Sequence, residues 1–152
     1  MMKNRILCLD LGTKTGYSIV ENNKVVKSGT KDFKPTRFQS SDYRFILFRN
    51  FLNTLLPANQ VFFEEVRRHI GVDAAHCYGG FKAVLTTFCQ DNNINYSGVA
   101  VGTIKKSVTG NGAAKKDMVI RAVQNRGFNP IDDNEADAIA IGLHVICTNL
   151  LS

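Results

Sequence analysis

The sequence predicts an α/β domain in which a mixed five-stranded sheet is flanked by helices. Its first part holds three short apolar runs separated by turn residues, which is typical of an antiparallel meander. Later segments alternate between helical spacing and short apolar runs, which favours further strands joined by helices. The 152 residues, 44% of them hydrophobic, suffice for one core, so we expect a single domain spanning residues 1–152.

Five strands are expected from short runs of apolar residues bounded by turn residues. They span residues 5–11, 16–20, 24–27, 60–66 and 95–101. The segment Glu21-Asn22-Asn23 has turn chemistry, so the second and third strands should form a hairpin. The first three strands should therefore be antiparallel neighbours.

Four helices are expected where apolar residues recur at three- and four-residue steps. They span residues 38–56, 73–90, 115–126 and a last segment from residue 132 or 133 to about residue 149. Pro57 should end the first helix and Gly127 the third. The Gly79-Gly80 pair should loosen the second. The predicted order of elements is β-β-β-α-β-α-β-α-α.

Charge and apolar patterning restrict the partners and the compartment. The net charge is +6 and the isoelectric point is about 9.3, which favours an anionic partner such as nucleic acid or lipid. The four cysteines are scattered among apolar residues, so we expect buried free thiols in a reducing cytosol. Asp10 interrupts the apolar N-terminal run, and residues 138–146 are too short to span a bilayer. We expect a soluble cytoplasmic protein with no membrane partner.

Three acidic residues stand in strongly apolar surroundings. Asp10 lies within the first predicted strand, Glu64 ends the fourth, and Asp137 lies between two alanines of the last helix. A carboxylate on a buried strand is costly unless a positive charge compensates it. If the fourth strand pairs with the first, Asp10 and Glu64 become neighbours, and the last helix could lay Asp137 across them. Oxygen ligands without histidine or cysteine suit Mg²⁺ or Mn²⁺.

Each of these acids also has a purely structural interpretation. Asp10 could end its strand and cap the turn at Gly12, Glu64 could be an exposed charge at a strand end, and Asp137 could pair with a lysine. The metal interpretation gains weight because the three positions converge on one plausible edge of the sheet. We therefore interpret them together as a metal site.

Further acidic and amide side chains crowd the start of the last helix. Asp132, Asp133 and Glu135, taken one by one, fit solvent-facing or capping positions better than ligand positions. Asp133 and Asn134 nevertheless share a helix face with Asp137, at four and three residues' distance. Either could add a fourth ligand.

Four motifs resemble those of the RuvC Holliday-junction resolvases. Residues 7–17 (LCLDLGTKTGY) resemble the family's opening, in which a strand-borne aspartate precedes a glycine-rich turn and a Thr-Gly-Tyr. Residues 63–66 (FEEV) resemble its strand-end glutamate motif. Residues 104–116 (IKKSVTGNGAAKK) resemble its lysine-bearing segment, and residues 134–140 (NEADAIA) its terminal acidic helix, which His144 follows at a similar distance. The motifs stand in the family's order and cover most of the chain.

The resemblance implies an RNase H-like fold of the ribonuclease H/integrase type. It also implies a homodimer and metal-dependent nicking of branched DNA, above all four-way (Holliday) junctions. Phage and mobile-element members of the family are expected to resemble the chain best, which would place it in a bacterial or phage-infected cell. The small residues of segment 74–85 could contribute to the dimer surface, or could pack into the core.

The same resemblance suggests a mechanism. Asp10, Glu64, Asp137 and either Asp133 or Asn134 would hold two Mg²⁺ ions about 4 Å apart, and Mn²⁺ should substitute. One ion would activate a water molecule and the other would stabilise charge on the leaving 3′ oxygen, so that a 5′ phosphate remains.

Basic residues complete the expected site. Lys116 and Lys105 match the family's basic positions and would contact phosphates or the developing charge. Lys106 and Lys115 adjoin them and are expected to contact DNA. A solvated helix face is the alternative interpretation of these lysines.

The chain departs from the family pattern at two places. The family usually has an aspartate where Asn134 stands, so either Asn134 acts through its carbonyl or Asp133 replaces the missing acid; we favour Asp133. The aromatic residue with which the family wedges open a junction is not matched, and Arg67, Arg68 and His69 occupy that region. Arg67 and Arg68 are expected to touch the DNA backbone or the branch point.

Three alternatives stay open. Residues 10–16 also resemble the first phosphate loop of the actin, hexokinase and sugar-kinase ATPases, but those enzymes close two such domains over ATP and this chain has room for one. A related nuclease could act on flaps or RNA–DNA hybrids. A catalytically inactive DNA-binding module of the same fold would also fit the departure at Asn134.

Overall fold

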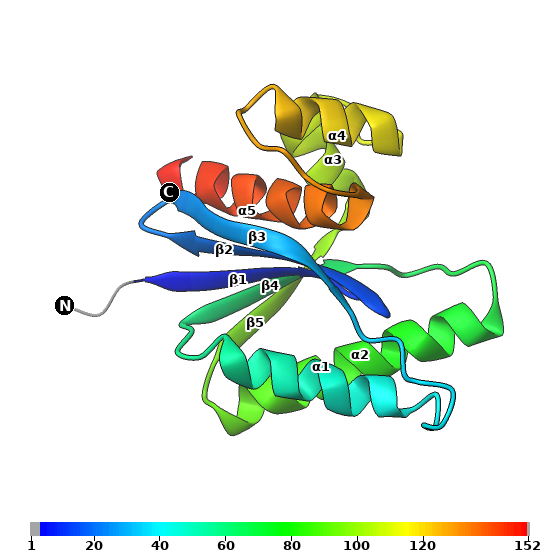
Figure 1. The fold of residues 1–152 in the computed structure, drawn as a ribbon. Helices are drawn as coiled ribbons and strands as arrows, with labels where there is room; N and C mark the ends of the chain where they lie inside the picture. Colours follow the sequence, from blue (N-terminus) through cyan, green and yellow to red (C-terminus); the bar gives the residue numbers. More distant parts are fainter. Residues whose placement is uncertain (1–3, 152) are drawn as a thin grey trace.

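A single five-stranded sheet forms the centre of the computed structural model, which describes residues 4–151 (Figure 1). The strands are β1 (Arg5–Asp10), β2 (Lys14–Glu21), β3 (Lys24–Asp32), β4 (Gln60–Glu65) and β5 (Asn95–Ala100). Their order in the sheet is β3-β2-β1-β4-β5. β1 pairs antiparallel with β2 and parallel with β4, and β5 is parallel to β4. The predicted mixed five-stranded sheet is confirmed, and β1 lies at its centre.

Helices cover both faces of this sheet (Figure 1). They are α1 (Tyr43–Thr54), α2 (Val72–Asp91), α3 (Val101–Thr109), α4 (Lys116–Gln124) and α5 (Asp133–Leu151). α1 and α2 lie together on one face, whereas α5 lies across the other with α3 and α4 beside it. Within residues 4–151, no helix combines the length and the apolar character that crossing a membrane requires.

Three element predictions need correction. α1 begins at Tyr43 rather than at residue 38. α2 runs unbroken through Gly79-Gly80. The missing side chain of Gly80 leaves room for the ring of Phe45 on α1, which a Cβ atom there would overlap. α3 was not predicted at all. Its buried side chains, Ile104 and Val108, provide a single helical repeat before Gly110 ends the helix in a left-handed conformation.

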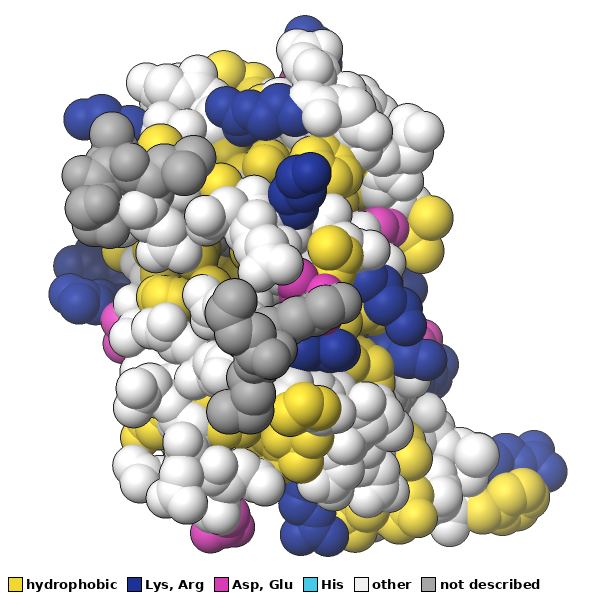
Figure 2. Space-filling view, turned by 90° about the vertical axis from the view of Figure 1, so that its left-hand side faces the viewer, with side chains coloured by type: hydrophobic (Ala, Val, Ile, Leu, Met, Phe, Trp, Pro, Cys, Tyr) yellow, Lys and Arg dark blue, Asp and Glu magenta, His cyan; other side chains and the backbone are white. Residues whose placement is uncertain are grey.

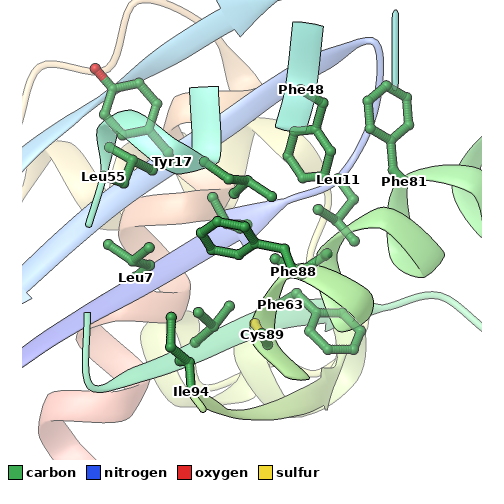
Figure 3. Close-up of a cluster of buried hydrophobic side chains, with 14 of the residues drawn as sticks. Leu7, Leu11, Tyr17, Phe48, Leu55, Phe63, Phe81, Phe88, Cys89 and Ile94 are labelled. Atoms are coloured by element: carbon green, nitrogen blue, oxygen red, sulfur yellow. The ribbon is translucent and has the colours of Figure 1, made fainter. Parts of the chain in front are cut away.

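Side chains of β1 alternate between two buried clusters, one on each face of the sheet. Leu7 and Leu9 belong to the cluster under α1 and α2, which Figure 3 shows. Ile6 and Cys8 belong to the cluster under α3, α4 and α5. Because Asp10 continues the second series, its carboxylate emerges on the α5 side of the sheet.

The cysteines carry free thiols but only two of them are buried. Cys8 and Cys89 lie in the two cores, Cys77 is half-buried and Cys147 is exposed. The expectation that all four are buried is therefore wrong for Cys147, in the last part of α5, and is met only in part by Cys77.

Candidate active site

The pairing of β1 with β4 brings two carboxylates together. Leu9 is opposite Phe63 in this parallel ladder, so the following residues, Asp10 and Glu64, are adjacent at the carboxyl ends of the two strands. Phe62 packs into the cluster under α5, and Glu64, two residues on, emerges on the same side as Asp10. The two carboxyl groups are close enough for Glu64 to raise the pKa of Asp10. The pairing of the first and fourth strands, which the metal interpretation assumed, is present in the structure.

α5 can lie close over this edge because small and hydroxyl residues of β2 face it. Gly16, the partner of Asp10 in the β1–β2 ladder, contacts the backbone carbonyl of Asn134 so closely that a Cβ atom would overlap it. One turn further, the buried Ser18 hydroxyl donates a hydrogen bond of 2.7 Å to the carbonyl of Ala138. Asp137 is thereby held beside the two strand ends.

The first turn of α5 is anchored to β3 by a reciprocal cap. Asp132 Oδ1 accepts hydrogen bonds from the Glu135 backbone N–H (2.8 Å) and from the Thr30 hydroxyl (2.7 Å). Glu135 in turn accepts from the Ile131 backbone N–H (2.9 Å) and the Ser28 hydroxyl (2.6 Å). Asp132 is thus a capping residue, as one interpretation held. Glu135 is buried, at 7% exposure, and not solvent-facing.

The pKa values of two acids in this cluster, Asp10 of β1 and Asp137 of α5, are strongly raised. The pKa of Asp10 is raised well above its ordinary value, first by burial and then by the charges of Glu64 and Asp137. The pKa of Asp137 is raised to about 7, first by burial and then by Glu64 and Asp133, against an opposing effect of Lys105. These side chains therefore form one electrostatic cluster, whose negative charge Lys105 offsets only in part.

The remaining ligand candidates lie on the first turn of α5. Asp133 forms an ion pair of 3.0 Å with Lys116 of α4, which lowers the pKa of Asp133 and raises that of Lys116. Asn134 is half-buried, with its backbone against Gly16. His144, further along α5, is half-buried as well, and burial lowers its pKa.

The chemistry of this cluster suits a hard divalent cation. Its side-chain donors are carboxylate oxygens, which Mg²⁺ and Mn²⁺ prefer. Burial and the neighbouring carboxylates raise the pKa values of Asp10 and Asp137, so a bound cation would favour their charged forms. Among residues 4–151, however, no three histidine, cysteine, aspartate or glutamate side chains surround one point closely enough to hold an ion as they stand. Binding would require these carboxylates to turn toward a shared ion.

The other basic candidates are spread around the cluster. Lys105 of α3 is near enough to Asp137 to lower its pKa. Lys106 and Lys115 are exposed at the end of α3 and just before α4, and Arg67 and Arg68 are exposed on the loop that follows β4. Figure 2, which views the end of the molecule where β1 begins, shows lysine and arginine side chains over that remote face too. Net charge alone therefore does not locate the site.

One residue beside the cluster had no sequence signal. The hydroxyl of Tyr78 on α2 contacts the backbone on both sides of Glu65, next to Glu64. Helical spacing predicts that Tyr78 lies on α2, but not that it reaches the end of β4. That contact follows only from the way α2 packs on the sheet.

Comparison with known proteins agrees with this architecture. The family model of the crossover junction endodeoxyribonuclease RuvC matches residues 6–145. The crossover junction endodeoxyribonuclease RuvC of Brachyspira hyodysenteriae (strain ATCC 49526 / WA1) is 29% identical over 140 residues, which cover 86% of this chain and 85% of that protein.

Solved structures share the fold. The Thermus thermophilus RuvC structure superposes with a TM-score of 0.76 at 16% identity, covering 96% of both chains. The same protein in complex with a Holliday junction substrate also gives 0.76, at 18% identity, covering 97% of this chain and 96% of that one. The yeast mitochondrial Holliday junction resolvase Ydc2 gives 0.63 at 14% identity, covering 94% and 79%. With acids on β1, β4 and α5 of this fold and a family match along nearly its whole length, the chain belongs to the RuvC family of crossover junction endodeoxyribonucleases.

Proposed function

We propose that this protein nicks four-way DNA junctions by metal-dependent hydrolysis of phosphodiester bonds. The observation that carries the proposal is the cluster of Asp10, Glu64 and Asp137 at the carboxyl ends of β1 and β4, in which burial and neighbouring carboxylates raise the pKa values of Asp10 and Asp137. Burial and mutual repulsion make such a cluster unfavourable for the bare protein, and a divalent cation would relieve both costs. Its natural setting would be the cytoplasm of a bacterial or phage-infected cell.

RuvC nucleases are metal-dependent, and we propose Mg²⁺ as the ion for this chain, with Mn²⁺ able to substitute. Asp10, Glu64 and Asp137 would hold the metal, with Asp133 or Asn134 as a further ligand. Bound metal would make a water molecule more acidic and offset negative charge on the phosphate and the leaving 3′ oxygen. Asp10 and Glu64 define the position of this chemistry, since their strands are fixed in register.

Lys116 links the cluster to the substrate in this proposal. Its ammonium group pairs with Asp133 at 3.0 Å, although its side chain is 79% exposed. A DNA phosphate arriving at the cluster could take over this ammonium, which would free Asp133 to turn toward the metal. Lys105 would offset part of the negative charge near Asp137.

Exposed basic residues would hold the DNA backbone. Lys106, Lys115, Arg67 and Arg68 are all exposed, on elements that flank the cluster. Contacts of this kind give affinity without reading sequence and weaken as salt concentration rises. Junction binding should therefore be strongly salt-dependent.

We also propose a homodimer, because a four-way junction offers two equivalent strands to be nicked. The segment 74–85 of α2 is only partly available for such contacts. Phe81 and Leu85, its large apolar residues, are fully buried in the core, whereas the small residues Ala74 and Ala83 are exposed. The exposed small residues are the part that we assign to the dimer surface.

A substrate panel tests the proposed function. Wild-type protein should nick a four-way junction in Mg²⁺ or Mn²⁺ much faster than a flap, an RNA–DNA hybrid or a linear duplex. In Ca²⁺, and as the Asp10→Asn variant, it should still bind the junction but not cut it. Retained cutting by Asp10→Asn would remove Asp10 from the mechanism.

The same experiment decides between this activity and a DNA-binding module that has lost cleavage, which the asparagine at position 134 would allow. Junction binding in Ca²⁺ without any nicking in Mg²⁺ or Mn²⁺ would identify the protein as that module. Preferred cutting of flaps or hybrids would assign a different substrate to the same site.

A further inference from the structure

The end of β4 is held by a tyrosine hydroxyl of α2. Tyr78 Oη donates a hydrogen bond to the backbone carbonyl of Glu64 (3.0 Å) and accepts one from the backbone N–H of Val66 (3.1 Å). One side chain therefore fixes the main chain immediately before and after Glu65. One of the two bonded groups is the backbone carbonyl of Glu64, whose side chain is the β4 member of the carboxylate cluster.

This pattern of bonds is that of a neighbouring strand. In a parallel ladder, a residue opposite Glu65 would donate its N–H to the carbonyl of Glu64 and accept from the N–H of Val66. β1 cannot supply that residue, because it ends at Asp10, beside Glu64. The Tyr78 hydroxyl makes both bonds in its place. Two backbone groups at the site thus depend on one side chain from another layer of the fold.

α2 also holds the side chain of Glu65, the residue between the Glu64 carbonyl and the Val66 N–H. Lys82, one turn after Tyr78, forms an ion pair of 3.5 Å with Glu65 Oε1. Gly98 on β5 leaves room for the Glu65 side chain, because a Cβ atom there would lie 2.9 Å from Glu65 Oε2. Glu65 is therefore turned toward α2, and the alternation of the strand turns Glu64 to the opposite face, where Asp10 lies.

The Tyr78 side chain is packed between its neighbours. The side chain is half-buried, and the His69 ring lies 5.0 Å from its ring, centre to centre. A phenol hydroxyl carries its proton at neutral pH, so it can donate to the Glu64 carbonyl while it accepts from the Val66 N–H.

We infer that Tyr78 is a positioning residue that sets the orientation of Glu64 toward Asp10 and so tunes the affinity of the carboxylate cluster for metal. The inference rests on the proposed function, in which Glu64 is a metal ligand. Without the hydroxyl, the Glu64 carbonyl and the Val66 N–H lose their shared partner. The end of β4 then gains freedom, and the Glu64 carboxylate spends less time in the geometry that binds the ion.

The test compares Tyr78→Phe with a matched control, Tyr96→Phe. Both changes remove one hydroxyl and keep the ring, but the Tyr96 hydroxyl only accepts a hydrogen bond from Gln90 on the rim of the sheet. For each protein, the Mn²⁺ dependence of junction nicking gives a half-saturating concentration and a maximal rate. Junction affinity in Ca²⁺ and hydrogen exchange at the Val66 amide are measured on the same samples.

Tyr78→Phe should raise the half-saturating Mn²⁺ concentration about tenfold, equivalent to about 1.4 kcal/mol of binding free energy. Excess Mn²⁺ should restore most of the rate, and junction affinity should stay within about twofold of wild type, since no phosphate contact is removed. The Val66 amide should exchange faster. Tyr96→Phe should match wild type in all four measurements.

Rates are normalised to the folded fraction, which circular dichroism reports at the assay temperature, so that a loss of stability is not mistaken for a loss of positioning. An unchanged Mn²⁺ dependence in Tyr78→Phe, or a Val66 amide that exchanges freely in wild type, would overturn the inference while leaving the nuclease intact. A wild-type protein that does not nick junctions in any metal would instead overturn the proposed function.

Discussion

Replacing Asp137 with asparagine should stabilise the metal-free protein at pH 8 while it abolishes nicking. The pKa of Asp137 is raised from 3.8 to about 7, chiefly by burial and by the charge of Glu64. Between these pH values the folded protein keeps a proton that the unfolded chain has released. Folding stability therefore falls as pH rises from about 4 to about 7, and the loss is complete above pH 7. The asparagine variant has no carboxylate at this position and avoids that loss.

The size of the effect follows from the pKa difference. A pKa about three pH units above the unfolded value corresponds to at most about 4 kcal/mol, at about 1.4 kcal/mol per unit. Asp137 is partly exposed, so water screens part of this cost. We expect the variant to gain about 1–2 kcal/mol over wild type at pH 8, or about 2–8 °C in melting temperature for a chain of this length.

Urea unfolding in EDTA at pH 5 and pH 8 measures the difference. The gap between Asp137→Asn and wild type should be larger at pH 8 than at pH 5. Asp117→Asn serves as control, because Asp117 is an exposed residue of α4 paired with Arg121, and its effect should be small at both pH values. Added Mg²⁺ should raise the stability of wild type more than that of Asp137→Asn. A variant that is no more stable than wild type at pH 8 would refute the claim that this carboxylate is electrostatically strained.

Three further substitutions test how the site is built. Gly16→Ala should destabilise the protein by at least about 2 kcal/mol and abolish nicking, because the added Cβ atom would meet the backbone of α5. Gly79→Ala is the control, since Gly79 faces open space and the change should not destabilise the protein; urea unfolding midpoints compare the two variants. Lys116→Gln should lower the nicking rate about 10- to 100-fold but change the free energy of unfolding by less than about 0.5 kcal/mol, since the ion pair of Lys116 with Asp133 is exposed. A fall in nicking rate that is fully explained by a loss of folding stability would contradict the proposed contact of Lys116 with the substrate. Asp132→Ala should cost about 1–2 kcal/mol in thermal unfolding through loss of the helix cap, and an unchanged melting temperature would show that the cap contributes nothing.

Most of the sheet could be predicted because its signals are local. The apolar runs around Leu7, Val20 and Val61 and the turn at Asn22 are contained in short windows, so strand positions follow from them. The position of Asp10 beside Glu64 required one added assumption, the pairing of β1 with β4, which the fold confirms. The pairing of β1 with β4, which are far apart in the sequence, could therefore be inferred once the acidic residues were interpreted as one cluster.

The parts that could not be predicted depend on contacts between distant segments. α3 has only Ile104 and Val108 to mark its buried side, too short a repeat to distinguish a helix from a loop. The burial of Glu135 depends on hydroxyl donors such as Ser28 of β3, more than 100 residues earlier. Likewise, the reach of Tyr78 to the end of β4 is decided by the packing of α2, which residue spacing does not encode.

The most direct test of the central claim is a crystal structure of the protein soaked in Mn²⁺, with the ion located by its anomalous scattering. We expect Mn²⁺ between the carboxylates of Asp10, Glu64 and Asp137, at oxygen–metal distances of about 2 Å. Carboxylates that stay more than about 8 Å apart, too far to share an ion at such distances, with no anomalous peak between them, would contradict the proposal that these residues form one metal-dependent nuclease site.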